Sequence, residues 1–442
     1  MPNRLRRALL NGGRPFNPRA AGPTRAQAPS QGNPGAAEAR VPPAAGPGTE
    51  AAEMAALPPS ALPPGPVDPT AALPPRTARL NVWRESGTGG ESYGLAGICC
   101  CGISLTYQRQ PQQVKPSRLT LGDLIHGGDG GESPTKTFLR LMSWSKDASE
   151  GLKRFLSAIR RAHGDDVRMI IEDVTGYGLP WELLRHRDKD LAGEWLGALF
   201  PIARSMGTPP AAVTRCTGEI LAYVAPDMAD DRALLDRFRM TTRDVTLKGL
   251  LNLLDAEGDP VSLVYVACHG RYGRTGTPTS GAEIKLIEGS RGSKRGISLR
   301  EVHAHDLLRL EQAGGLVFLN ACHSARERVD PDLDNTTLRS FARIFLDAGA
   351  SGFIGTMGEV GREHGYDLAK SLLDAFIEDP DTPVVVALRD YRRKAAAPIV
   401  GVPGEDDDEA AAQLLPFFYA FMYAYFGSPE TTLRPTPREK AR

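Results

Sequence analysis

From residue 219 onward, short apolar segments alternate with segments of helical spacing. Residues 219–226, 261–270, 315–322 and 351–357 are each apolar along almost their whole length. Strands that are apolar throughout are buried on both faces, which is typical of a mostly parallel sheet covered by helices. The intervening segments predict these helices: 230–254 (one long helix or a pair), 299–310, 337–348 and 363–377. The alternation therefore predicts an α/β fold with helices on both faces of the sheet.

The residues before this alternation predict two further regions. Residues 1–77 are dominated by Pro, Ala and Gly, so they have few large apolar groups to offset the entropy of ordering and are expected to be a disordered leader. Residues 78–215 predict a smaller α/β region with strands at 78–83, 97–109 and 167–174 and a helical segment at 134–162. We expect the folded part to end near residue 430, followed by a flexible tail over 431–442.

Charge and hydropathy restrict the partners. The 442 residues contain 53 basic and 53 acidic side chains, so no excess of cations favours nucleic acid. No apolar segment of a secretory signal follows the basic first ten residues. The apolar stretches 93–105 and 414–427 are shorter than the ~20 residues of a membrane-spanning helix, and we interpret them as buried strands or core segments. The expected protein is cytoplasmic, with neither membrane nor nucleic acid as a partner.

Six cysteines in a chain of this length do not predict a disulfide scaffold. Cys99, Cys100 and Cys101 are consecutive, and neighbours on a strand point to opposite faces, so we expect buried apolar residues there and no closed metal site. Zinc is also disfavoured at a second set of two cysteines and two histidines, because adjacent strand residues diverge and no Cys-x-x-Cys spacing is present. That set is Cys268, His269, Cys322 and His323.

Two residues of the same set, His269 and Cys322, are placed in the sequence as a base and a thiol nucleophile would be. His269 and Cys322 each end a predicted strand, and ligands of such sheets collect at the carboxyl ends of the strands. The chain between them is long enough for a crossover between adjacent parallel strands. An imidazole beside a thiol can take its proton, and the N–H groups of Gly270 and Cys322 could stabilise an oxyanion. Cys268 is expected in the core, and His323 in a loop near the site.

Around these residues the sequence resembles the CHAT-domain family, which are caspase-like cysteine peptidases of the separase, gingipain and caspase clan. Residues 263–270 (LVYVACHG) and 316–325 (LVFLNACHSA) resemble its His and Cys motifs. Further similar segments extend the resemblance over about residues 135–430: 178–186, 346–360, 384–395 and 416–430. The resemblance implies a caspase-like fold, with 78–215 as a pseudo-caspase-like region and 216–430 as the catalytic half.

Transferred by residue, the resemblance makes His269 the general base and acid, Cys322 the nucleophile and Gly270 an oxyanion-hole donor. The chain departs from the family in having His323 after the nucleophile, where Glu or Asp is more common. Met357-Gly358 stands where a tryptophan is common. These departures bear on substrate preference more than on the chemistry.

The clan's primary specificity pocket corresponds to Asp227 and Asn320 in this sequence. An acidic side chain in a closed pocket would pair with a cation, which favours Arg or Lys before the scissile bond. Asp227 could instead cap a helix, and Asp230 and Asp231 are the next candidates. Glu172-Asp173 also ends a strand, but ahead of the catalytic half.

Together these features predict a regulated cysteine endopeptidase without cofactor or metal. Its expected partners are a protein or peptide substrate and an activating protein or proteolytic activator, and the resemblance implies a role in bacterial defence or cell death. The arginine-containing loops at 271–296 and 323–339 are candidate processing sites. The alternative is a catalytically silent scaffold of the same fold. A nucleotide-binding protein is disfavoured, because no phosphate-binding glycine motif follows a strand.

Overall fold

A computed structural model describes most of the chain beyond the leader. The described residues are 73–85, 92–109, 133–188, 191–207, 214–240, 246–274, 282–290, 293, 295–329, 338–399 and 408–438. The predicted leader (1–77) lies almost entirely outside them, and so does the end of the predicted tail. The leader is therefore not tested. Thr432–Pro435 of the predicted tail form a strand that pairs with Arg215–Gly218, so the folded part extends past residue 430.

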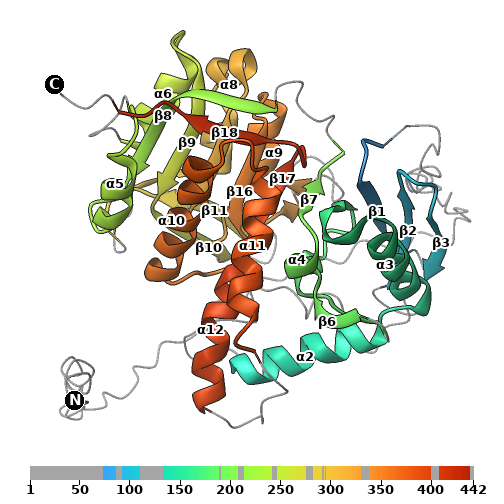
Figure 1. Cartoon of the computed structure of the whole chain (residues 1–442). Coiled ribbons are helices and arrows are strands. Elements are labelled where there is room, and N and C mark those ends of the chain that lie inside the picture. Colours follow the sequence, from blue (N-terminus) through green and yellow to red (C-terminus); the bar gives the residue numbers. More distant parts are fainter. Residues whose placement is uncertain are drawn as a thin grey trace, which may run out of the picture. The chain divides into compact units, whose positions relative to one another are not determined.

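An eleven-stranded sheet organises the described residues (Figure 1). Its strands lie in the order β18-β8-β9-β13-β16-β17-β7-β4-β1-β2-β3. Seven of the ten neighbouring pairs are parallel, and β16·β17, β1·β2 and β2·β3 are antiparallel. The α/β class and the mostly parallel sheet flanked by helices are confirmed.

The strands of this sheet have the following bounds: β1 (Thr77–Glu85), β2 (Ser92–Cys99), β3 (Ser104–Arg109), β4 (Arg168–Asp173), β7 (Ile202–Ser205), β8 (Arg215–Val224), β9 (Val261–Ala267), β13 (Leu316–Asn320), β16 (Gly352–Thr356), β17 (Tyr423–Gly427) and β18 (Thr432–Pro435). Smaller sheets are formed by β5 (Arg185–Asp188) with β6 (Leu191–Trp195), by β10 (His269–Arg274) with β11 (Ala282–Ile287) and β12 (Gly296–Ser298), and by β14 (Arg328–Val329) with β15 (Leu338–Arg339).

The helices are α2 (Pro134–Asp147), α3 (Glu150–His163), α4 (Leu196–Leu199), α5 (Ala229–Leu235), α6 (Leu247–Asp255), α7 (Leu299–His303), α8 (Leu308–Ala313), α9 (Phe341–Asp347), α10 (Arg362–Glu378), α11 (Val384–Ala396) and α12 (Asp408–Met422). In Figure 1, α10 and α11 lie in front of the sheet, and α3 lies against β1, β2 and β3.

Two hydrophobic cores correspond to the two halves of the sheet. One joins β1, β2 and β4 to α2 and α3, and the other joins β8, β9, β13 and β16 to their helices. The apolar stretch 414–427 serves both, because Phe417, Phe418 and Phe421 of α12 enter the first core while β17 enters the second. A division at residue 216 remains a prediction, since this late segment packs on both sides of it.

Several predicted elements are divided more finely than the sequence suggested. The helical segment 134–162 is two helices, because the Ser149 side chain caps α3 by accepting a hydrogen bond from Leu152 N. The predicted helix 299–310 is also two, because Leu307 adopts a left-handed backbone conformation (φ 52°) with its N–H bonded to Asp255. The predicted strand 97–109 is wrong: a turn at Cys100–Cys101 separates β2 from β3. Cys100 and Cys101 are therefore exposed, and only Cys99 is buried as expected.

Candidate active site

The carboxyl ends of β9 and β13 meet at one edge of the sheet. These neighbours are parallel, and Ala267 is in register with Asn320. The chain directly after β9 stays in contact with β13, because Cys268 N donates to Asn320 O at 3.3 Å. The predicted proximity of the two motif ends follows from this register.

Gly270 lies directly against the backbone of Cys322. A Cβ at position 270 would lie 1.7 Å from the Cys322 carbonyl oxygen and 2.8 Å from its nitrogen, so no larger residue fits without a backbone shift. Two backbone N–H groups therefore flank the Cys322 side chain, one from Gly270 and one from Cys322 itself, and both lower the pKa of the thiol. Two convergent backbone donors are the arrangement that an oxyanion hole requires.

His269 is held by a carboxylate. Its Nε2 lies 2.8 Å from Asp227 Oδ2, in the loop that follows β8. Because the carboxylate can only accept, a neutral imidazole must place its proton on Nε2, which leaves the Nδ1 lone pair free to accept a proton. Burial would raise the pKa of Asp227, but the hydrogen bond and charge of His269 outweigh it, and that pKa lies below its ordinary value.

Cys322 is the partly exposed thiol of this edge. Burial raises the pKa of the thiol, and backbone groups of Val360, Gly270 and Cys322 offset part of the effect. Its Sγ lies 3.8 Å from Val360 O, and the contacts of the described residues include no hydrogen bond between this thiol and His269. Without a partner that takes its proton, the thiol stays protonated at neutral pH.

The turn that presents Cys322 is fixed by two hydroxyl groups that the sequence analysis missed. Ser324 Oγ donates to Leu319 O at 2.9 Å and accepts from Thr356 N at 3.0 Å. Thr356 Oγ1 donates to Ala321 O at 2.7 Å. A small hydroxyl residue two positions after the cysteine was the available signal, but its partner on β16 is visible only in three dimensions.

The two flanking residues lie where they were expected. Cys268 is 1 % exposed, and burial raises the pKa of its thiol far above the ordinary range. His323 is buried beside the site with a positive φ of 61°, its N–H bonded to Gly358 O and its ring against Tyr272. The left-handed backbone conformation of His323 directly follows Cys322.

A cavity of about 750 Å³ lies at this edge, and His269, Gly270 and Cys322 all line it. Asn320 and Asp231 line it as well, whereas Asp227 does not. The amide of Asn320 donates to Asp231 Oδ1 at 3.1 Å, and the Tyr265 hydroxyl donates to the same oxygen. The cavity wall thus contains a buried carboxylate.

The carboxylates named from the sequence occupy different environments. Burial raises the pKa of Asp231, and its hydrogen bonds offset only part of that effect. Asp230 is exposed and forms an ion pair with Arg362 at 2.9 Å. Glu172 and Asp173 end β4 in the other half of the sheet and do not line the cavity. Of these candidates Asp231 is the one that lines the cavity; Glu359 lines it as well, but its side chain is about half exposed, whereas Asp231 is buried.

A family model agrees with this part of the chain. The CHAT domain model matches residues 218–399, which include both motif ends and the strands that precede them. The chain contains a CHAT domain. Within the described residues, no helix of the protein is both long and apolar enough to cross a membrane.

The solved structures to which this chain is similar have low sequence identity to it. A structure entitled "Structure of Protease" is 10% identical over 69% of this chain and 77% of its own, with a TM-score of 0.40. The Porphyromonas gingivalis RgpB pro- and mature-domain complex is 11% identical over 73% and 76%, with a TM-score of 0.40. The Saccharomyces cerevisiae separase–securin complex is 12% identical over 63% and 17%, with a TM-score of 0.32. No curated protein matches the sequence.

Proposed function

We propose that the protein is a cysteine endopeptidase in which Cys322 is the nucleophile and His269 the general base and acid. One observation supports this most: the thiol, the imidazole and the Gly270 backbone line a single cavity at the edge of the sheet. Asp227 completes the arrangement, because its carboxylate leaves the Nδ1 atom of His269 free to accept a proton.

In the proposed reaction, His269 Nδ1 takes the thiol proton as Cys322 Sγ attacks the scissile carbonyl carbon. The carbonyl oxygen becomes an oxyanion that accepts hydrogen bonds from the N–H groups of Gly270 and Cys322. The C–N bond then breaks, and the imidazolium gives its proton to the departing amine. A water molecule, deprotonated by the same imidazole, hydrolyses the thioester and restores the thiol.

The preference for Arg or Lys before the scissile bond is proposed to come from Asp231 together with Asn320. Both line the cavity, and a guanidinium or ammonium group would stabilise the buried charge of Asp231. The sequence assigned this role to Asp227. Its hydrogen bond to His269 supports a positioning role instead, and the two roles predict different kinetics.

The peptidase activity is proposed to be regulated through the protonation of the Cys322 thiol and its approach to His269. The pKa of Cys322 is raised and the thiol lacks a hydrogen bond to His269 among the described contacts, so activation would need the two groups to approach. An activating protein or a cleavage could supply that movement. The predicted processing loops lie partly outside the described residues, at 275–281 and 330–337. A role in bacterial defence or cell death remains a prediction from the family.

The test is hydrolysis of fluorogenic peptides ending in Arg, Lys or Asp, before and after limited digestion with immobilised trypsin. We expect Arg and Lys substrates to be cleaved, and Cys322→Ala to lower the rate by about 10⁴-fold or more. Cys216→Ala, which removes a buried thiol that does not line the cavity, is the control and should retain activity. Cleavage by Cys322→Ala at the parental rate would exclude the peptidase assignment, and inactivity throughout would favour the scaffold.

A second variant addresses specificity. Asp231→Asn keeps the shape of the side chain and removes its charge, so kcat/KM for Arg substrates should fall at least about 10-fold relative to an uncharged substrate. An unchanged preference would remove Asp231 from the pocket while leaving the Cys322 result intact.

A further inference from the structure

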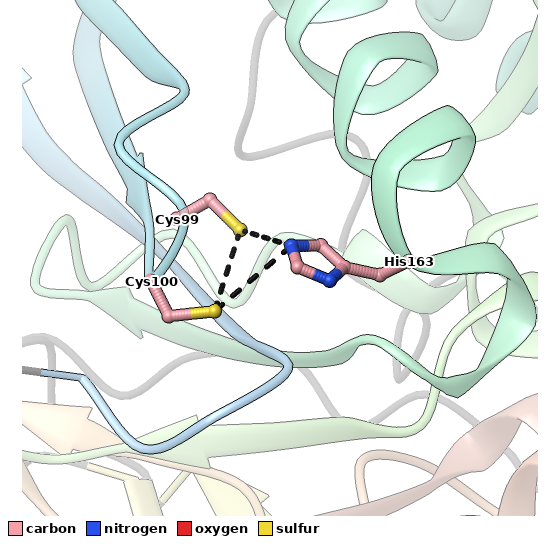
Figure 2. A group of neighbouring side chains, drawn as sticks. All are labelled: Cys99, Cys100 and His163. Carbon is pink, nitrogen blue, oxygen red and sulfur yellow. Dashed lines mark hydrogen bonds between the residues drawn. The ribbon is translucent and has the colours of Figure 1, made fainter.

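Three side chains converge in the N-terminal half, far along the chain from the cavity (Figure 2). Cys99 ends β2, Cys100 follows it, and His163 is the last residue of α3. His163 Nε2 lies 3.3 Å from Cys99 Sγ and 3.9 Å from Cys100 Sγ, and the two sulfur atoms are 4.0 Å apart. Among the residues that the structure describes, this is the one group of three His, Cys, Asp or Glu side chains whose ligand atoms all lie within 4.8 Å of one another.

The turn between β2 and β3 explains how adjacent cysteines face the same way. Gly102 N donates to Cys99 O at 2.9 Å, and Cys99 N donates to Ile103 O at 2.8 Å, which closes a three-residue hairpin loop. Gly102 has a φ of 88°, the left-handed position that such loops require. The alternation of side chains therefore stops at Cys99, and the argument from the sequence against a metal at this triplet does not apply.

We propose that Cys99, Cys100 and His163 bind one Zn²⁺ ion. Zinc–sulfur bonds of about 2.3 Å and zinc–nitrogen bonds of about 2.0 Å in tetrahedral geometry place two sulfurs about 3.8 Å apart and sulfur about 3.5 Å from nitrogen. The three observed separations match the edges of one face of such a tetrahedron to within half an ångström. Two thiolates and one imidazole are also the donor set that a borderline-soft ion prefers.

Two simpler interpretations explain less of the geometry. A hydrogen bond between Cys99 and His163 accounts for one contact but not for the convergence of the Cys100 sulfur. A disulfide requires sulfur atoms about 2.05 Å apart, and these lie 4.0 Å apart. Cys100 is exposed and His163 partly exposed, so an ion could enter from solvent and keep a fourth coordination position open.

Zinc binding would release one proton from each thiol. Because the ligands bind as thiolates, the ion competes with protons for both sulfur atoms. The bound ion would tie the tip of the β2–β3 hairpin to the end of α3. Because ions that bind only the folded chain stabilise it, zinc should raise the melting temperature.

The test uses full-length, tag-free Cys322→Ala protein under a phosphine reductant, so it does not depend on peptidase activity. After removal of metals with a chelator, we expect one equivalent of Co²⁺ to give the thiolate charge-transfer and intense d–d absorption of a tetrahedral site. One equivalent of Zn²⁺ should abolish these bands, and zinc should raise the melting temperature. Absent bands and an unchanged melting temperature would overturn the proposal and leave only a thiol–imidazole hydrogen bond.

The variants test the identity of the ligands. Cys100→Ser and His163→Gln change exposed or partly exposed residues, which keeps the fold intact, and each should weaken zinc binding by more than the roughly 10- to 100-fold that loss of an outer-shell partner costs. Cys101→Ser is the matched control, because Cys101 is an adjacent exposed thiol outside the group. Equal losses in Cys100→Ser and Cys101→Ser, or none in His163→Gln, would overturn the assigned ligand set.

Discussion

Among the residues that the structure describes, cysteine and histidine side chains lie near one another at two places, one across a cavity and the other in direct contact. At the edge formed by β9 and β13, Cys322 and His269 line a cavity, and the imidazole is bonded to the Asp227 carboxylate. At the β2–β3 turn, His163 contacts Cys99 directly, and the second sulfur of Cys100 completes the group.

The difference teaches what each arrangement can do. A nucleophile needs open space where a substrate carbonyl can lie, and a base with one lone pair free. A metal site needs ligand atoms that face one point with only enough space for an ion. The residue types are the same, so the geometry around them distinguishes a proposed catalytic site from a proposed metal site.

The largest expected effect is that single substitutions abolish either peptide cleavage or zinc binding and leave the other unchanged. Cys322→Ala and His269→Ala should each lower peptide cleavage by about 10⁴-fold or more, because both groups act in the same step. Both should bind zinc as the parent does. Cys100→Ser should show the reverse, with zinc affinity lost and cleavage within about two-fold of the parent. Parallel losses of both properties in either set would show that the sites are not independent, and both properties can be measured on the same purified samples.

How much of this was predictable from sequence differs between the two sites. The sheet and the meeting of His269 with Cys322 followed from apolar periodicity, because parallel strands align their carboxyl ends whatever the loops do. The positions of the Asp231 and Ser324 side chains could not be predicted, because the conformation of a short turn after a strand determines where such side chains point. The Cys99 group was missed because alternation was extended one residue past the end of β2.

The next largest effect on peptide cleavage is expected for a substitution of Asp227. Asp227→Asn replaces an acceptor with an amide that can donate to His269 Nε2, which would move the imidazole proton to Nδ1 and block its role as a base. We expect kcat to fall by about 10²- to 10⁴-fold for every substrate, with KM little changed. Asp230→Asn is the matched control, since Asp230 is exposed and paired with Arg362. A rise in KM confined to Arg and Lys substrates would instead support the specificity role predicted from the sequence.

Peptide cleavage and zinc affinity should depend on pH with slopes that differ by one proton. The pKa of Cys322 is raised by burial, so the thiol is protonated at neutral pH and cleavage should increase with pH, by at most about 10-fold per unit. Zinc binding displaces one proton from each of two thiols, so zinc affinity should increase more steeply with pH than cleavage does. The measurements are kcat/KM and a chelator-competition titration from pH 6 to pH 9. Equal slopes would contradict the assignment of two thiolates to the metal.

The last comparison is between one glycine at each site, and the smallest expected effect is that of Gly102→Ala. Gly270→Ala places a Cβ 1.7 Å from the Cys322 carbonyl oxygen, so the backbone must move, and we expect the free energy of unfolding to fall by at least about 2 kcal/mol together with a loss of cleavage. Gly102→Ala meets no atom within 4 Å, and its cost is confined to the left-handed φ of 88°, about 1 kcal/mol. Zinc affinity should then change by no more than a few-fold, because the ligands keep their positions. Urea unfolding of both variants measures the difference; a larger loss for Gly102→Ala would mean that the hairpin conformation, rather than the contact between the two motif ends, is the more demanding backbone geometry in this chain.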